Sequence, residues 1–130
     1  MAAKGRLVAV QPVLPSRDVA LAVAWYVHKL GFHMRYTDQP TAPRYAVLLR
    51  DGVELHLQWA DEAQFPPGLD RPMLRFPVED ILALFAEYSS KGVFHDRTAL
   101  RRTEWKTEEF AFYDRDGNGL TFYRALGPDE

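Results

Sequence analysis

The sequence contains no cysteine, and its 130 residues carry no long apolar run and no large excess of charge of one sign. Without cysteine, disulfides, thiolate metal ligands and a cysteine nucleophile are excluded. The formal net charge of -2 gives no general attraction to nucleic acid or to anionic lipid. Apolar residues make up 47% of the chain and charged residues 26%, as in ordinary globular domains. We therefore expect a single domain over residues 1–130, without a polyanionic partner.

Apolar residues near the start of the chain form only the short run LVAVQPVL (7–14). Gln11 and Pro12 interrupt this run, which is too short for a membrane span or a signal peptide. We therefore expect a cytoplasmic protein with no membrane partner.

The first half of the sequence predicts a strand, a helix and three more strands. Residues 7–14 are rich in β-branched side chains, as strands are. A helix is indicated after Ser16 or Asp18, either of which can cap it, because apolar residues recur at helical spacing up to Leu30. Gly31 then follows as a left-handed helix cap. The remaining strand-like runs are 32–36, 44–50 and 53–59, and a loop is expected at 60–72.

The second half repeats this order. Seven positions from Asp18 to His33 match residues of the same or a similar class 62 positions later, from Asp80 to His95. Matches at a single offset indicate an internal repeat. The predicted elements are a strand at 73–78, a helix at 79–90, and strands at 93–96, 109–114 and 119–124.

The repeat predicts two β-α-β-β-β units, at residues 6–59 and 72–125. Each unit has roughly sixty residues, which is too few to bury its own sheet face well. We therefore expect the two units to pack against each other.

The segment FYDRDGNGLTFY (112–123) partly matches a calcium-binding loop. Acidic or amide residues fill positions 1, 3 and 5 of that pattern, and Gly119 fills position 6. Position 12, however, is Ala125, which cannot replace the bidentate acidic ligand, and the flanking residues alternate like strands. The segment therefore predicts a hairpin turn and no calcium site.

Three features carry a resemblance to a known family: the repeated unit, the segment VLPSRDVALAVAWYVHKLGF (13–32), and the segment FAFYDRDGNGLTFY (110–123). In this order and spacing they resemble the vicinal oxygen chelate superfamily, which contains glyoxalase I, extradiol dioxygenases and bleomycin-resistance proteins. The chain is most similar to the small bleomycin-resistance type, through PVL, RDVA, LGF and the pair of Trp105 and EFA. The resemblance implies an α+β fold in which two tandem β-α-β-β-β units form a concave mixed sheet.

Enzymes of this superfamily hold one divalent metal with side chains from both units. The resemblance places those positions at Gln11, Glu54, Met73 and Thr121, of which only Gln11 and Glu54 can donate. Zinc, iron or manganese in such a site generally takes at least about three protein ligands. His56 could supply a third, because it lies two residues from Glu54 on the same strand face. We expect no metal and no cofactor, with a site of Gln11, Glu54 and His56 as the alternative.

Strand alternation turns a set of side chains of mixed polarity toward the concave face, which suits a medium-sized organic ligand. Trp105 is expected to form an aromatic wall there, the alternative being that it packs under the irregular segment 97–107. Trp25 instead belongs to the apolar pattern of the first helix. No catalytic residue is assigned. The expected ligand-binding residues are Gln11, Glu54, His56, Arg75, Trp105, Thr121 and Tyr123.

The resemblance implies a homodimer with ligand pockets at its interface, which binds a small organic molecule without metal and without changing it. The ligand is a bleomycin-like drug or an unknown metabolite, since Arg75 and the weak net charge do not favour cationic bleomycin. One alternative is a metal-dependent lyase, isomerase or dioxygenase of the same superfamily. Another is a protein-interaction module whose pocket is filled by Met73 and Tyr123. The incomplete set of metal ligands argues against an enzyme without deciding the question.

Overall fold

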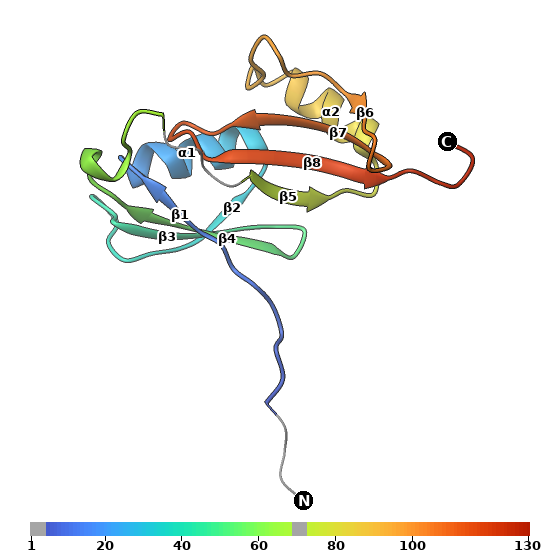
Figure 1. Ribbon diagram of the computed structural model, residues 1–130. Coiled ribbons are helices and arrows are strands. Elements are labelled where there is room, and N and C mark those ends of the chain that lie inside the picture. Colours follow the sequence, from blue (N-terminus) through green and yellow to red (C-terminus); the bar gives the residue numbers. More distant parts are fainter. Residues whose placement is uncertain (1–4, 69–72) are drawn as a thin grey trace, which may run out of the picture.

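The computed structural model describes residues 5–68 and 73–130, and it contains two four-stranded mixed sheets (Figure 1). The first half consists of β1 (Val13–Ser16), α1 (Val19–Leu30), β2 (His33–Thr37), β3 (Tyr45–Arg50) and β4 (Val53–Trp59), followed by the short helix η1 (Glu62–Gln64). The second half consists of β5 (Met73–Pro77), α2 (Ile81–Ser89), β6 (Arg101–Arg102), β7 (Thr107–Tyr113) and β8 (Gly119–Ala125). Residues 69–72 of the predicted loop lie outside the described residues.

The two sheets have equivalent strand orders, β1-β4-β3-β2 and β5-β8-β7-β6. In each sheet the first strand pairs in parallel with the last, and the other neighbours are antiparallel. The predicted α+β class and the repeated β-α-β-β-β order are therefore confirmed. No helix among the described residues is long and apolar enough to cross a membrane.

The helix α1 begins and ends where its capping residues predict. The side chain of Asp18 accepts a hydrogen bond from the Leu21 backbone N–H at 3.1 Å. Gly31 closes the helix in the left-handed region, at φ 77°, which glycine adopts without strain. The side chains that α1 buries recur at helical spacing and are Val19, Ala22, Tyr26 and Leu30. This apolar face packs against β2, β3 and β4.

One predicted strand is displaced along the chain, and another is absent. The first sheet starts only at Val13, so residues 7–12 belong to no strand. In the second half, residues 93–96 form no strand, and the fourth strand is the short β6 instead. Composition favours an extended backbone at both places, but a strand also needs a neighbour with free hydrogen-bonding groups.

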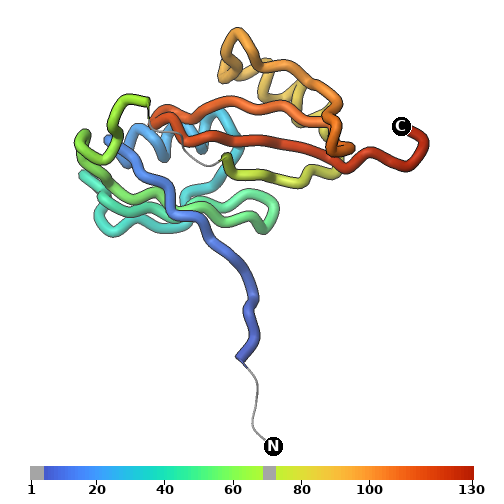
Figure 2. Tube along the Cα trace, in the orientation of Figure 1, coloured from blue at the N-terminus to red at the C-terminus, as the bar shows by residue number. Residues whose placement is uncertain are grey.

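Residues 5–11, which we call the N-terminal arm, extend away from the body of the protein (Figures 1 and 2). The side chains of Leu7, Val8 and Val10 on this arm are each more than 90% exposed. The arm joins the first sheet at Pro12, whose carbonyl accepts a hydrogen bond from the His56 backbone N–H at 2.9 Å.

Aromatic side chains from both halves build the common core. Phe110, Phe112 and Phe122 on the second sheet pack with Tyr88 of α2, at ring-centroid distances from 5.4 to 6.5 Å. Trp25 of α1 packs edge-on against Phe112 at 6.4 Å, so it belongs to the core side of the helix as predicted. One hydrophobic core therefore serves both sheets.

The turn between β7 and β8 joins the two halves through a buried carboxylate. Asp114, only 7% exposed, accepts a hydrogen bond from the Tyr26 hydroxyl at 2.7 Å. Asp114 also accepts from the backbone N–H groups of Asp116 and Asn118, each at 2.9 Å. Asp116 in turn accepts from the Arg17 backbone N–H at 2.8 Å. The predicted hairpin turn is confirmed, with Gly117 at φ 82°.

Burial is the main cause of the pKa shifts of Asp114 and Tyr26. Burial raises the pKa of Asp114 above its ordinary value, although its hydrogen bonds oppose that shift. Burial also raises the pKa of Tyr26 well above its ordinary value, and the neighbouring carboxylate adds to the shift. Tyr26 therefore stays protonated and remains a donor to Asp114 at neutral pH.

We expect Asp114→Ala to lower the free energy of unfolding by about 3–5 kcal/mol, because it leaves several buried donors without an acceptor. Tyr26→Phe should cost only about 1 kcal/mol, since Asp114 keeps its other donors. Asp96→Ala, at an exposed position, serves as the control and should change stability by less than about 0.5 kcal/mol. Urea unfolding measures all three, and equal stabilities of the Asp114 and Asp96 variants would contradict the expectation.

Candidate functional site

The outer face of the second sheet carries polar side chains in alternation with the core residues. Leu74, Phe76, Phe110, Phe112, Leu120 and Phe122 are packed in or against the core. Because neighbouring strand residues point to opposite faces, Arg75, Glu109 and Tyr123 lie on the other side of the sheet. Glu109 pairs with Tyr123 in the register of β7 and β8, and Arg75 pairs with Thr121 in that of β5 and β8.

Glu109 is the centre of the contacts on this face. One oxygen of its carboxylate accepts hydrogen bonds from the Thr107 hydroxyl at 2.7 Å, the Arg75 guanidinium at 3.1 Å and the Trp105 indole N–H at 3.4 Å. Burial raises the pKa of Glu109, but the bonds from Thr107, Arg75 and Trp105 outweigh burial and leave this pKa below its ordinary value. Glu109 is therefore ionised at neutral pH, with Arg75 as its partner.

Two aromatic side chains flank this ion pair. The Arg75 guanidinium lies 4.3 Å from the centre of the Tyr123 ring, which is a cation–π contact. Trp105 remains 64% exposed, so the alternative that it packs under the segment 97–107 does not hold. Thr121, in contrast, is only 4% exposed and has little surface to offer a ligand.

A cavity of about 270 Å³ opens beside Trp105. The strand β7 supplies Glu109 and Tyr113 to its wall. The residues that precede β7 supply Arg97, Arg101 and Trp105. The rings of His95 and Tyr113 stack at the same cavity, with centroids 5.7 Å apart and planes 25° apart.

The outer face of the first sheet holds a second polar cluster. Glu54 accepts a hydrogen bond from the Arg35 guanidinium at 3.0 Å, and its other oxygen lies 2.7 Å from Nε2 of His56. Nδ1 of His56 lies within hydrogen-bonding distance of the Tyr45 hydroxyl. These side chains alternate with Leu55 and Leu57, which are buried in the core.

The alternative metal site of Gln11, Glu54 and His56 does not fit these contacts well. Both ring nitrogens of His56 are already engaged, by Glu54 and by Tyr45. Gln11 is exposed at the end of the N-terminal arm and lies outside β1. In the described ranges, no group of three or more His, Cys, Asp or Glu side chains is placed to hold a metal ion.

The structure thus divides the predicted site residues between two faces. Arg75, Trp105, Thr121 and Tyr123 lie on the second sheet or beside it, whereas Glu54 and His56 lie on the first. Within the described residues, no hydrogen bond or ion pair links the two groups. Glu109 and Tyr45 belong to these clusters but were not predicted from the sequence. Strand alternation could have found Glu109, because it shares the parity of Thr121 and Tyr123 across the hairpin.

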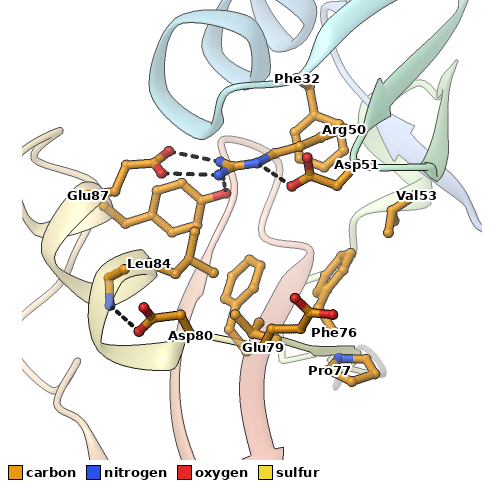
Figure 3. A pocket seen from close by; sticks show the side chains of 14 residues that line it. Phe32, Arg50, Asp51, Val53, Phe76, Pro77, Glu79, Asp80, Leu84 and Glu87 are labelled. Carbon is orange, nitrogen blue, oxygen red and sulfur yellow. Dashed lines mark hydrogen bonds and ion pairs between the residues drawn. The ribbon is translucent and has the colours of Figure 1, made fainter.

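A larger cavity, of about 620 Å³, lies where the β3–β4 hairpin meets β5 and α2 (Figure 3). Arg50 crosses it and donates to both oxygens of Glu87 and to the Leu30 carbonyl, at 2.6 to 3.0 Å. The Tyr88 hydroxyl accepts from the same guanidinium at 3.1 Å. This cationic group is therefore fully used in joining the two halves, so the cavity offers a ligand less than the face around Trp105 does.

Tandem β-α-β-β-β units with polar outer sheet faces define a class of α+β domain rather than one activity. The chain belongs to the glyoxalase/bleomycin resistance protein/dioxygenase superfamily, whose family model matches residues 8–122.

Curated relatives and solved structures agree with this assignment. The chain is 27% identical over 129 residues to a bleomycin resistance protein of Geobacillus stearothermophilus, covering 88% of this chain and 95% of that protein. The bleomycin-binding protein of Streptomyces verticillus, solved with copper(II)-bleomycin, has a TM-score of 0.76 and 23% identity, with 95% of this chain and 99% of that chain covered. The antibiotic-binding protein TnmS3 of Streptomyces sp. CB03234 has a TM-score of 0.70 and 24% identity, with 94% and 99% covered. These structural likenesses concern the fold.

We expect the purified protein to contain clearly less than one equivalent of zinc, iron, manganese or nickel per chain, because His56 has no free ring nitrogen and Met73 and Thr121 cannot replace acidic or imidazole ligands. Elemental analysis after dialysis checks this. One tightly held ion per chain that is lost in His56→Ala, but kept in His28→Ala as the control, would overturn the expectation.

Proposed function

We propose that this protein binds a small organic molecule without a metal and sequesters it in the cytoplasm, with an antibiotic as the leading class of ligand. The observation that carries the proposal is the exposed indole of Trp105, held by Glu109 on a polar sheet face beside a cavity. Exposed aromatic rings beside fixed polar groups are typical of sites that bind organic ligands. The relatives named bleomycin resistance protein support the antibiotic class.

The contacts on this face favour binding over catalysis. The carboxylate of Glu109 is ionised and held by three donors, so it is better suited to orienting neighbouring groups than to accepting a proton. His56 is likewise held between Glu54 and Tyr45. Fixed polar groups of this kind lower the entropy cost of ordering a binding site.

We further propose that the protein acts as one domain, with units at 6–59 and 72–125, and as a homodimer. The two polar faces lie on different sheets of one chain, and a second copy would bring the Glu54 face of one protomer to the Trp105 face of the other. In that arrangement Gln11, Glu54 and His56 come from one subunit and Arg75, Trp105, Thr121 and Tyr123 from its partner. Each pocket would then need both subunits.

The N-terminal arm supports the dimer. This segment leaves the body of the protein, and it carries three branched apolar side chains that are almost fully exposed, Leu7, Val8 and Val10. Burying such side chains is worth about 1.5–3 kcal/mol each, so an exposed arm favours a partner surface. The edges of the sheets, at β1, β2, β5 and β6, offer backbone groups with which an extended arm can pair.

Binding should depend on Trp105. When metal-free or copper-loaded bleomycin is titrated, we expect saturable quenching of tryptophan fluorescence, because stacking changes the environment of the indole. Trp105→Ala should weaken binding by about 1–3 kcal/mol in calorimetry, as for an aromatic anchor. Trp25→Ala is the matched control, because it should lower stability by about 2–4 kcal/mol through lost core volume without a selective loss of affinity. Absence of saturation in every titration, together with no effect of Trp105→Ala, would exclude drug sequestration.

Removal of residues 1–11 should convert a dimer to a monomer that still folds, because the arm adds nothing to its own core. Size-exclusion chromatography with light scattering measures the mass, and circular dichroism checks the fold. The triple variant Leu7→Ser, Val8→Ser, Val10→Ser should act in the same direction. Leu82→Ser, at a position 63% exposed on α2, is the control and should leave the mass unchanged. A monomeric parent at micromolar concentration would rule out the proposed dimer.

A further inference from the structure

The cavity beside Trp105 carries more positive than negative charge. Arg97 and Arg101 line it, and the carboxylate on its wall, Glu109, is already paired with Arg75. Among the described residues, neither Arg97 nor Arg101 has a carboxylate partner for its guanidinium, and Arg101 donates only to the Arg97 carbonyl, at 3.2 Å. The cavity wall therefore holds two arginines, Arg97 and Arg101, beside one carboxylate that Arg75 already neutralises.

Comparison with the adjacent Arg102 shows that the excess of positive charge lies on one face of β6. In the register of β6 and β7, Arg101 is opposite Glu109, and Arg102 is opposite Glu108. Arg102 points to the other face, where its side-chain nitrogens lie 4.0 Å from Glu108 and 3.5 Å from Glu130. Arg102 is thus compensated by acidic groups, whereas Arg101 faces the cavity without a carboxylate partner in the part of the chain that the structure describes.

Planar side chains at the same cavity favour an aromatic ligand. Trp105 is 64% exposed and Tyr113 is 54% exposed, and Tyr113 is held flat by stacking on His95. Large aromatic surfaces that remain exposed beside a cavity indicate a binding surface. The volume of about 270 Å³ lies slightly below that of common ligand sites, which measure about 300–1,000 Å³, so the ligand should be compact.

We propose that this cavity takes a compact planar aromatic anion, a compound of one or two rings with a carboxylate, sulfonate or phosphate group. This rests on the proposed function and specifies the ligand of the same site. The ring lies against Trp105 or the His95–Tyr113 stack, and the acidic group is bound by Arg97 and Arg101. Guanidinium groups suit this role because they donate two parallel hydrogen bonds to such oxyanions. The same charges disfavour a compact organic cation, whose charge would lie beside Arg97 and Arg101.

A matched ring series tests the charge preference. Calorimetric titration of the full-length protein uses naphthoate and naphthalenesulfonate, the neutral naphthalenemethanol and the cationic naphthylmethylammonium. We expect both anions to bind at least about tenfold more tightly than the neutral and cationic compounds, since hydrogen bonds between charged groups are among the strongest. Their affinity should fall as salt is raised, because the arginines are partly exposed.

Two single variants separate a local from a general charge effect. Arg101→Gln should weaken binding of the anions about fivefold or more and leave the neutral compound unchanged. Arg102→Gln removes the same charge from the adjacent residue on the opposite face, and it should change the affinity less than about twofold. Circular dichroism confirms that both variants fold.

The outcomes distinguish the inference from the function on which it rests. If the neutral or cationic compound binds as tightly as the anions, and Trp105→Ala weakens the binding of that compound, the preference for an anion is wrong. The proposal of a ligand site at Trp105 is then kept. Equal losses in Arg101→Gln and Arg102→Gln also overturn the inference. If none of the series binds, the inference fails, and the bleomycin titration then decides whether a ligand site exists at all.

Discussion

The buried carboxylate of Asp114 is the contact on which the arrangement of the two halves depends. It accepts from Tyr26 on α1 while also fixing the turn between β7 and β8. Asn118 strengthens this junction by donating to the Pro15 carbonyl at 3.1 Å, next to the start of α1. A buried acceptor with several donors tolerates few rearrangements, because each displaced donor would be left unpaired. The polar turn thus helps to set how the sheets share one core.

This shared core determines what the outer faces can do. Since the apolar side chains of both sheets point inward, the alternate side chains must point outward, and both outer faces are polar. Arg50 adds a second link between the halves through Glu87. The hydrogen bonds to Glu87 raise the pKa of Arg50 above its ordinary value. The halves are thus linked at two places, at the β7–β8 turn and at Arg50.

The sequence predicts most of the fold because its strongest signals are local. Asp18 and Gly31 mark the ends of α1, and Asp51-Gly52 forms the β3–β4 turn with both residues at positive φ. The arm failed as a strand because propensity describes the backbone's preference, whereas a strand also needs a partner in the chain. The network at Glu109 depends on the register of β8 with its two neighbours, β7 and β5, and on the turn that brings Trp105 back, with Lys106 at φ 68°. Neither the register nor that turn can be read from spacing.

Packing around Met73 and Thr121 opposes a metal ligand in the second half. Met73 occupies the position where the superfamily resemblance places an imidazole, and its sulfur lies against Gly119 so closely that a Cβ there would be 1.8 Å from it. Thr121, at the other ligand position, is buried in the sheet. A histidine at residue 73 would therefore lose the contact of the thioether with Gly119 and would still lack an acidic partner at residue 121. Gly119, Met73 and Thr121 thus form an uncharged part of this sheet. The charged groups next to it are Arg75, which is opposite Thr121, and its partner Glu109.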